Sequence, residues 1–319
     1  MPASYLRLFA SGELERRARE SVARLEDCRL CPRSCGVDRL AEEEGFCRTG
    51  RLSRVASYDL HFGEEAPLVG RSGSGTVFFM QCNLACEFCQ NWDISHGHEC
   101  GVRGAEVDAK GLARIMLDLQ NRGAVNINLV TPSHVVPQIL EALILAAEGG
   151  LRLPLVYNSG GYDLPETLEL LRDVVDIYLP DVKIWDPDLA GAWLEARDYP
   201  ERARAAVATM HRQVGNLRID EKKVARQGVL VRHLVLPEDA AGTGEWMKFL
   251  ADLSHDMYVN VMGQYRPCGR AGSYPALSRA VWPEEVEAAR VMARQAGLSR
   301  LDDRESDLVE RLFRRLVEP

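Results

Sequence analysis

The sequence predicts an α/β fold built on a parallel sheet, because short apolar runs alternate with longer segments of helical periodicity. The runs that predict strands span residues 76–80, 125–130, 155–157, 175–179, 229–236 and 257–262. Helix-like segments lie between or after them, at residues 108–122, 133–147, 165–173, 188–213, 244–253 and 283–296. Six strand–helix units are compatible with an open doubly wound sheet and with a partial barrel, and periodicity does not choose between them.

The segments outside this repeat predict an extension at each end of the chain. Residues 11–25 form an amphipathic pattern with Ser11 as the expected N-cap, and its apolar face carries Leu14, Ala18, Val22 and Leu25. A cysteine-rich segment follows, and residues 306–317 predict a last helix packed on the outside. We therefore divide the chain into an N-terminal extension (1–75), a βα core (76–300) and a C-terminal helix (301–319).

The composition limits the class of protein. Of the 319 residues, 46% are hydrophobic and 27% are charged, as in globular proteins, and the formal net charge of −8 argues against a nucleic-acid partner. The sequence shows no signal peptide and no apolar run near the roughly 20 residues that span a bilayer, so we expect a cytoplasmic protein that does not contact a membrane. Nine cysteines in a reducing compartment favour metal or cluster ligation over disulfides.

Three cysteines follow the first predicted strand of the core in the segment CNLACEFC. Cys82, Cys86 and Cys89 have the spacing C-x3-C-x2-C. A structural zinc site uses four closed ligands, whereas three thiolates on one loop suit three corners of a [4Fe–4S] cluster and leave one iron open for chemistry. The alternatives are a zinc knuckle or free thiols. Cys100 is the nearby candidate for a fourth ligand, and we interpret it as incidental.

This loop, placed after the first strand of a βα domain, resembles that of the radical S-adenosylmethionine (radical SAM) superfamily, in which an aromatic residue, here Phe88, commonly precedes the last cysteine. The resemblance implies that SAM chelates the open iron and is cleaved reductively to methionine and a 5′-deoxyadenosyl radical, which abstracts hydrogen from a substrate. It also implies an oxidoreductase with a reductant protein such as flavodoxin or ferredoxin.

The segment HFGEEAPLVGRSGSGTVFFMQCNLACEFCQNWDIS is similar to the group of pyruvate formate-lyase activating enzymes, in particular to a subgroup with extra N-terminal cysteines. The similarity runs from about Cys28 to Trp282. It implies a partial (β/α)6 TIM-like barrel with an N-terminal helical, cysteine-rich extension.

The same resemblance implies contacts to SAM from three later segments. Asn158 and Ser159 in VYNSGGYD match an Asn- and Gly-containing segment of the activating enzymes, although a glycine-rich turn is the alternative. Lys183 in PDVKIWD would pair with the methionyl carboxylate, with Asp181 orienting it or contacting substrate; a simple ion pair is the alternative. Arg232 matches a strand arginine of that group, and a buried guanidinium needs an anionic partner.

One segment departs from the superfamily pattern. A Gly-Gly-Glu sequence often follows the second strand and binds the amino group of SAM, whereas this chain has NLVTPSH at residues 128–134. Thr131, Ser133 or backbone carbonyls would have to replace that contact.

Polar residues at period two in two strands predict a polar cavity. Asn126 and Asn128 share one face of their strand, although a structural hydrogen-bond network explains them as well. On the last strand of the core, the corresponding face carries Asn260, Met262 and Gln264. Two other features leave alternatives open: His61, Glu64 and Glu65 suit a metal, a substrate or a solvated loop, and Cys268 suits a buried position or a hydrogen-donating thiol.

A second cysteine cluster lies in the N-terminal extension. Cys28, Cys31, Cys35 and Cys47 have the spacing C-x2-C-x3-C-x11-C, which closes a four-thiolate site. Either a second [4Fe–4S] cluster or zinc fits, and we favour iron–sulfur because the chain must already receive one cluster.

The sequence leaves the substrate open among three hypotheses. The first is a glycine of a partner enzyme, which would be activated to a glycyl radical. The second is a small molecule or another peptide residue, and the third is a non-catalytic iron–sulfur electron carrier.

Overall fold

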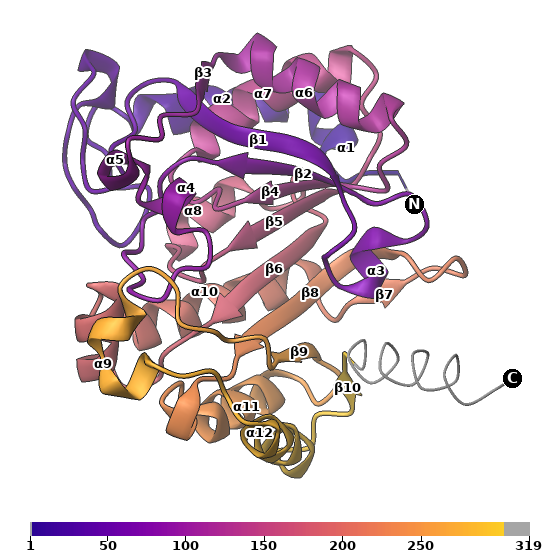
Figure 1. Cartoon of the computed structure of the whole chain (residues 1–319). Helices are drawn as coiled ribbons and strands as arrows, with labels where there is room; N and C mark the ends of the chain where they lie inside the picture. The colour runs from indigo at the N-terminus through magenta and orange to yellow at the C-terminus, as the bar shows by residue number, and fades with distance from the viewer. Residues whose placement is uncertain (1, 303–319) are drawn as a thin grey trace, which may run out of the picture.

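The computed structural model describes residues 2–302, so the helix predicted at 306–317 lies outside the described residues. It contains one mixed sheet of ten strands with helices packed against it (Figure 1). The strands are β1 (Ser53–His61), β2 (Ser74–Phe79), β3 (Ala105–Val107), β4 (Ile127–Val130), β5 (Leu155–Ser159), β6 (Ile177–Val182), β7 (Arg218–Ile219), β8 (Ala225–Leu234), β9 (Tyr258–Met262) and β10 (Arg300–Leu301).

The helices are α1 (Tyr5–Ala10), α2 (Glu13–Ala23), α3 (Ala66–Val69), α4 (Trp92–Ser95), α5 (Gly97–Cys100), α6 (Ala109–Asn121), α7 (Val136–Glu148), α8 (Pro165–Leu170), α9 (Pro187–Leu194), α10 (Tyr199–Val214), α11 (Thr243–Leu253) and α12 (Pro283–Gln295). Four 3₁₀ turns lie at Arg39–Ala41, Pro237–Asp239, Ala271–Ser273 and Pro275–Leu277.

The sheet is an open partial barrel, which confirms the predicted α/β class. Its main path runs β10-β9-β8-β6-β5-β4-β2-β1-β3, with β7 paired to β8 outside that path. Pairing is parallel from β2 to β10 and antiparallel at β1 and β3. Within residues 2–302, β3 and β10 form the two ends of the path, and Figure 1 shows them on opposite sides of the fanned sheet.

The six predicted strands correspond to β2, β4, β5, β6, β8 and β9, with shifted ends. β6 extends to Val182, so Asp181 lies within the strand, whereas the sequence placed it just past the strand end. The helix predicted at 188–213 is interrupted between α9 and α10. Ser11 does not cap α2: the N-cap is Gly12, and Ser11 instead ends α1.

The two faces of the sheet have separate apolar clusters. On the helix side, buried residues such as Leu129, Tyr157 and Tyr178 join the main core with the surrounding helices, and α2 packs on α7. On the other face, Leu68 of α3 packs with a smaller cluster comprising Val156, Ile177, Leu179, Leu217, Ala225 and Leu230. Because the side chains on both faces of these strands are buried, the strands appear in the sequence as continuous apolar runs.

The segment with α3 fills one end of the inner face. Asn126 fixes it there, because its side-chain amide donates to Leu68 O at 2.8 Å and its Oδ1 accepts from Ser74 Oγ at 2.6 Å. Asn126 precedes β4 and serves the structural network that the sequence left open as an alternative. Among the described residues, no helix is both long and apolar enough to cross a membrane.

Candidate functional site

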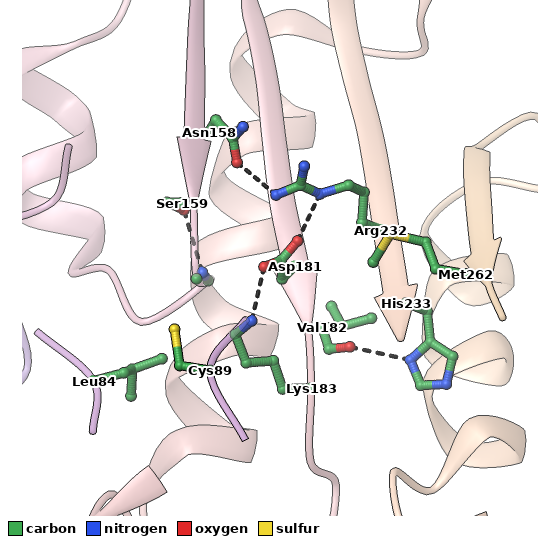
Figure 2. Close-up of polar contacts among 12 residues, drawn as sticks. Leu84, Cys89, Asn158, Ser159, Asp181, Val182, Lys183, Arg232, His233 and Met262 are labelled. Carbon is green, nitrogen blue, oxygen red and sulfur yellow. Dashed lines mark hydrogen bonds and ion pairs between the residues drawn. The ribbon is translucent and has the colours of Figure 1, made fainter. Parts of the chain in front are cut away.

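The site is built around a chain of partly buried charges that strand register brings together. Asp181 of β6 lies opposite Arg232 of β8 in the parallel pairing, so both side chains leave the sheet on the same face. Arg232 Nε donates to Asp181 Oδ1 at 2.7 Å, and Lys183 Nζ donates to Asp181 Oδ2 at 2.7 Å. Figure 2 shows this chain running from Asn158 through Arg232 and Asp181 to Lys183, while His233 points to the other face.

Protein groups satisfy the guanidinium of Arg232 on three sides. In addition to Asp181, Asn158 Oδ1 accepts from Arg232 Nη2 at 2.6 Å, and Glu64 Oε2 lies 3.5 Å from Arg232 Nη1. The anionic partners that burial of Arg232 requires are therefore present in the chain itself. A SAM carboxylate would add to this arrangement.

Electrostatics keep these groups charged. Burial alone would raise the pKa of Asp181, but Arg232 and Lys183 lower the pKa below its usual value. Burial would lower the pKa of Lys183 and of Arg232, and Asp181 raises the pKa of both instead. At neutral pH the site therefore holds the ammonium of Lys183 and the guanidinium of Arg232 beside the carboxylates of Asp181 and Glu64.

Glu64 and Glu65 are part of the site and do not form a solvated loop. Their exposed fractions are 8% and 4%. His61 Nδ1 lies 3.5 Å from Glu64 Oε1, and Glu65 Oε1 accepts from Asn260 Nδ2 at 2.9 Å. Burial raises the pKa of Glu65, whereas His61 and Arg232 outweigh burial and lower the pKa of Glu64. The sequence identified these carboxylates but could not predict their contact with Arg232, which comes from a strand far along the chain.

The three cysteines of CNLACEFC line the same cavity as the charged chain. A cavity of about 230 Å³ is bounded by Cys82, Cys86 and Cys89 on the loop after β2, and by Asp181, Lys183 and Arg232 on the sheet. Asn158, Ser159, Phe88, Met262 and Gln264, all identified from sequence, also line it. Residues not identified from sequence are Phe78, Phe79, Gln81, Leu84, Gln90, Asn91, Ile94, Ser95, Val130, Gly160 and Leu234.

Donors around the cysteines suit thiolate ligands. Ser95 Oγ donates to Cys89 Sγ at 3.1 Å, and Leu84 N donates to Cys82 Sγ at 3.4 Å. Burial raises the pKa of Cys82 to about 12, so the free thiol stays protonated until a cation compensates the thiolate. The three sulfurs and their donors therefore fit an iron–sulfur cluster, which takes thiolate ligands and sulfur-directed hydrogen bonds.

Phe88 and Ser159 have structural partners besides the cavity. Phe88 is 3% exposed and makes an edge contact with Tyr265 at 6.2 Å between ring centroids. Ser159 Oγ donates to Asp163 Oδ2 at 2.7 Å and accepts from Gly161 N at 3.2 Å. The hydroxyl of Ser159 is thus held inside the protein, and its contact to SAM stays a prediction.

Thr131 is one of the residues expected to replace the Gly-Gly-Glu contact, and that role stays a prediction. It lines the cavity directly after β4 and has φ +59°, an uncommon backbone conformation for a β-branched residue. Its backbone N–H donates to Asn158 O at 2.8 Å. Ser133 is buried and lies outside the cavity lining, as does Asn128, whose side-chain amide has no hydrogen-bond partner among residues 2–302.

The N-terminal cysteines surround a second, narrower cavity. Cys28, Cys31, Cys35 and Cys47 line it together with Arg33, Arg39, Phe46 and His134. Phe46 N donates to Cys35 Sγ at 3.3 Å, and Arg39 Nη1 lies 3.8 Å from Cys28 Sγ. Among residues 2–302, neither set of cysteines is arranged closely enough to coordinate a single metal ion. Each set lines a cavity. Four thiolates bound to zinc, or to an oxidised [4Fe–4S] cluster, give a site with a net charge of −2, and nearby cations would stabilise that charge.

The two remaining cysteines lie outside both sets. Cys100 ends α5 and is exposed, and Cys268 is half-buried in the loop after β9. Neither lines the cavity that contains Cys82, Cys86 and Cys89.

Comparison with known proteins gives matches over most of the chain. Residues 76–220 match the family model of the radical SAM superfamily. The uncharacterized protein MJ0674 of Methanocaldococcus jannaschii is 31% identical over 282 residues, which cover 87% of this chain and 77% of that protein.

Two solved structures are also similar. One is SuiB of Streptococcus suis bound to its precursor peptide SuiA, with 14% identity, a TM-score of 0.42, and coverage of 70% of this chain and 46% of that one. The other is the radical SAM methyltransferase TsrM of Kitasatospora setae with tryptophan and a SAM analogue, with 14% identity, a TM-score of 0.46, and coverage of 72% and 54%. This chain thus matches about half of each of those two chains.

Proposed function

The chain belongs to the radical SAM superfamily, and on that basis we propose that it abstracts hydrogen from a backbone glycine of a partner protein, as the pyruvate formate-lyase activating enzymes do. The observation that supports this proposal is the cavity shared by Cys82, Cys86, Cys89 and the Asp181–Lys183–Arg232 chain. When bound there, a reduced [4Fe–4S] cluster and SAM supply a 5′-deoxyadenosyl radical.

The residues around the cavity have distinct roles in this proposal. The three thiolates of Cys82, Cys86 and Cys89 would hold the cluster. Lys183 binds the methionyl carboxylate, and Asp181 fixes the position of the ammonium through its 2.7 Å contact. Asn158 and Arg232 orient the same end of SAM, while Phe88 and Leu234 exclude water from the cavity. A protein such as flavodoxin or ferredoxin supplies the electron.

The resemblance of one segment favours a glycine of a partner protein as the substrate. Residues 61–95 are similar to the group of pyruvate formate-lyase activating enzymes. This segment includes Glu64, which contacts Arg232, and the three cysteines that line the cavity.

The test is an anaerobic assay of the reconstituted, reduced protein. We expect it to cleave SAM to 5′-deoxyadenosine, and Cys86→Ala should abolish that product. Cys100→Ala is the matched control, because Cys100 is exposed and outside the cavity, and it should keep the activity. Formation of 5′-deoxyadenosine by Cys86→Ala would contradict the role of the loop, and a wild type that makes none while holding a reducible cluster would favour an electron carrier.

The substrate class has its own test. Peptides carrying α,α-dideuteroglycine should transfer deuterium to 5′-deoxyadenosine, measured by mass spectrometry. Cleavage of SAM without deuterium transfer from any such peptide, but with transfer from a deuterated small molecule, would favour the small-molecule hypothesis.

A further inference from the structure

Ser95 lies between a cysteine of the radical SAM loop and a histidine outside the cavity. Its Oγ is 3.1 Å from Cys89 Sγ and 2.9 Å from His96 Nδ1. Ser95 is the last residue of α4 and lines the cavity that contains the three cysteines. His96 is 6% exposed and does not line that cavity. The three side chains therefore form a hydrogen-bonded row that begins at a cluster ligand and ends at an imidazole behind it.

The chemistry of a cluster ligand fixes the direction of both hydrogen bonds. A thiolate has no proton, so Cys89 can only accept, and the hydroxyl of Ser95 donates to it. The oxygen of Ser95 then has lone pairs left and no proton to offer to His96. The 2.9 Å contact is therefore a hydrogen bond from Nδ1–H of His96 to Ser95 Oγ.

Packing holds the imidazole of His96 in place. Its ring stacks on Trp92, with 3.7 Å between the centroids and 5° between the planes, and its backbone N–H donates to Trp92 O at 2.8 Å. Trp92 lies against Gly269 in the loop after β9, where a Cβ would come within 2.2 Å of the indole. Because His96 is fixed on Trp92, the hydroxyl of Ser95 is oriented towards Cys89 and is not free to rotate.

The sulfurs of the loop differ in the kind of donor that they receive. Cys89 accepts from the side chain of Ser95, whereas Cys82 accepts from the backbone N–H of Leu84 at 3.4 Å. Reduction adds a negative charge to a cluster, so a hydrogen bond to one of its sulfurs stabilises the reduced form more than the oxidised form. The donor on Cys89 is thus one that a change of side chain can remove without removing a backbone contact.

From this geometry we propose that Ser95 and His96 are positioning residues that raise the reduction potential of the radical SAM cluster. His96 orients the hydroxyl of Ser95, and that hydroxyl donates to Cys89. An external one-electron reductant is oxidised as the cluster passes from the 2+ to the 1+ level. The electron stays on the cluster, and in this step no bond breaks and no proton moves. The inference rests on the cluster of the proposed function and not on the identity of the substrate.

The test is a redox titration of the reconstituted full chain with dithionite, followed by electron paramagnetic resonance. The signal of the radical SAM cluster is the one that Cys86→Ala removes. Ser95→Ala should make reduction of this cluster about tenfold less favourable, which for one electron is about 59 mV to lower potential. An unchanged potential in Ser95→Ala with the iron content of wild type would overturn the proposal.

Ser278→Ala is the matched control for the loss of a serine hydroxyl. Ser278 is exposed, donates to Pro275 O at 2.9 Å and does not line the cavity. Its substitution should leave the potential of the cluster unchanged. A fall equal to that of Ser95→Ala would show that the effect is not specific to the donor on Cys89, and would overturn the proposal.

Conservative variants separate the loss of a donor from damage to packing. Ser95→Thr keeps the hydroxyl and should keep the wild-type potential. His96→Asn keeps an N–H donor near the position of Nδ1, whereas His96→Phe keeps a ring that can stack on Trp92 but has no donor. We expect a lower potential in His96→Phe and the wild-type potential in His96→Asn. Equal falls in Ser95→Thr and Ser95→Ala, or in the two variants of His96, would overturn the proposal.

Failure of this inference can be distinguished from failure of the proposed function. A wild type that holds a reducible cluster but does not cleave SAM would reject the proposed function, and a lower potential in Ser95→Ala would still support the role of Ser95. A wild type that cleaves SAM while Ser95→Ala has the wild-type potential would reject this inference alone.

Discussion

Asp181→Asn is the substitution that most directly tests the buried charge chain. Asp181 is 18% exposed, and Lys183 and Arg232 are each 17% exposed. Asn has the same shape as Asp but no charge. It would leave an ammonium and a guanidinium, each formerly 2.7 Å from a carboxylate oxygen, without their common counterion. Glu64 would remain near Arg232, but only at 3.5 Å.

The magnitude follows from the cost of removing one partner of a buried ion pair. We expect the free energy of unfolding to fall by about 3–5 kcal/mol, because two cations lose compensation in a poorly solvated site. At roughly 2 °C per kcal/mol for a chain of this size, the melting temperature should fall by about 6–10 °C. The assay is anaerobic thermal unfolding of the cofactor-free chain followed by circular dichroism, so that SAM binding does not contribute.

The control is Asp252→Asn, which removes the carboxylate of an exposed ion pair with Lys248 at 3.0 Å. That pair should contribute at most about 0.5 kcal/mol. The pH dependence gives a second criterion. Because the pKa of Asp181 is lowered in the folded state, its contribution is present above the ordinary carboxyl pKa and is lost as pH falls through the folded value. The difference between wild type and Asp181→Asn should therefore shrink in acid. If Asp181→Asn destabilised the chain no more than Asp252→Asn, our account of the site would be wrong.

Two further predictions concern the outer face of β8 and the turn after β5. His233 accepts from Thr243 through Nε2 and is buried, which lowers its pKa to about 4. As pH falls from 7 to 5, His233 becomes protonated in the unfolded chain but not in the folded one. This residue should therefore lower the free energy of unfolding by about 2 kcal/mol over that range. Thermal unfolding of His233→Gln should show a smaller loss of stability between pH 7 and pH 5 than wild type. An equal loss in the two proteins would contradict this role of His233. Gly161 has φ +76°, and a Cβ there would lie 2.5 Å from Asp181 O. Gly161→Ala should therefore destabilise the chain by about 2–4 kcal/mol. Gly123→Ala shares the positive φ but has nothing within 4 Å, so urea unfolding should show a smaller loss; equal losses would indicate that the close contact contributes nothing.

The sequence was sufficient for features that depend on local spacing. Cys82, Cys86 and Cys89 are adjacent on one loop, so their convergence needs only that loop to fold, and the motif identified the superfamily. The six parallel strands were predicted because burial on both faces leaves a continuous apolar run. Four strands of the described chain were missed. β3, β7 and β10 have two or three residues each, which is too short for a periodic signal. β1 has nine residues, but most of them are exposed or half-buried, so the segment lacks a regular apolar alternation.

Only the tertiary structure decided which distant groups meet. The contact between Glu64 and Arg232 depends on the segment with α3 filling one end of the sheet, and Asn126 holds that segment through Leu68. The contact between Arg33 Nε and Asn83 O, at 2.9 Å, depends on how the N-terminal extension packs against the core. Local sequence determines which groups are available and on which face of an element they lie. Their partners are set by strand register and by packing between segments far apart in the chain, which periodicity does not encode.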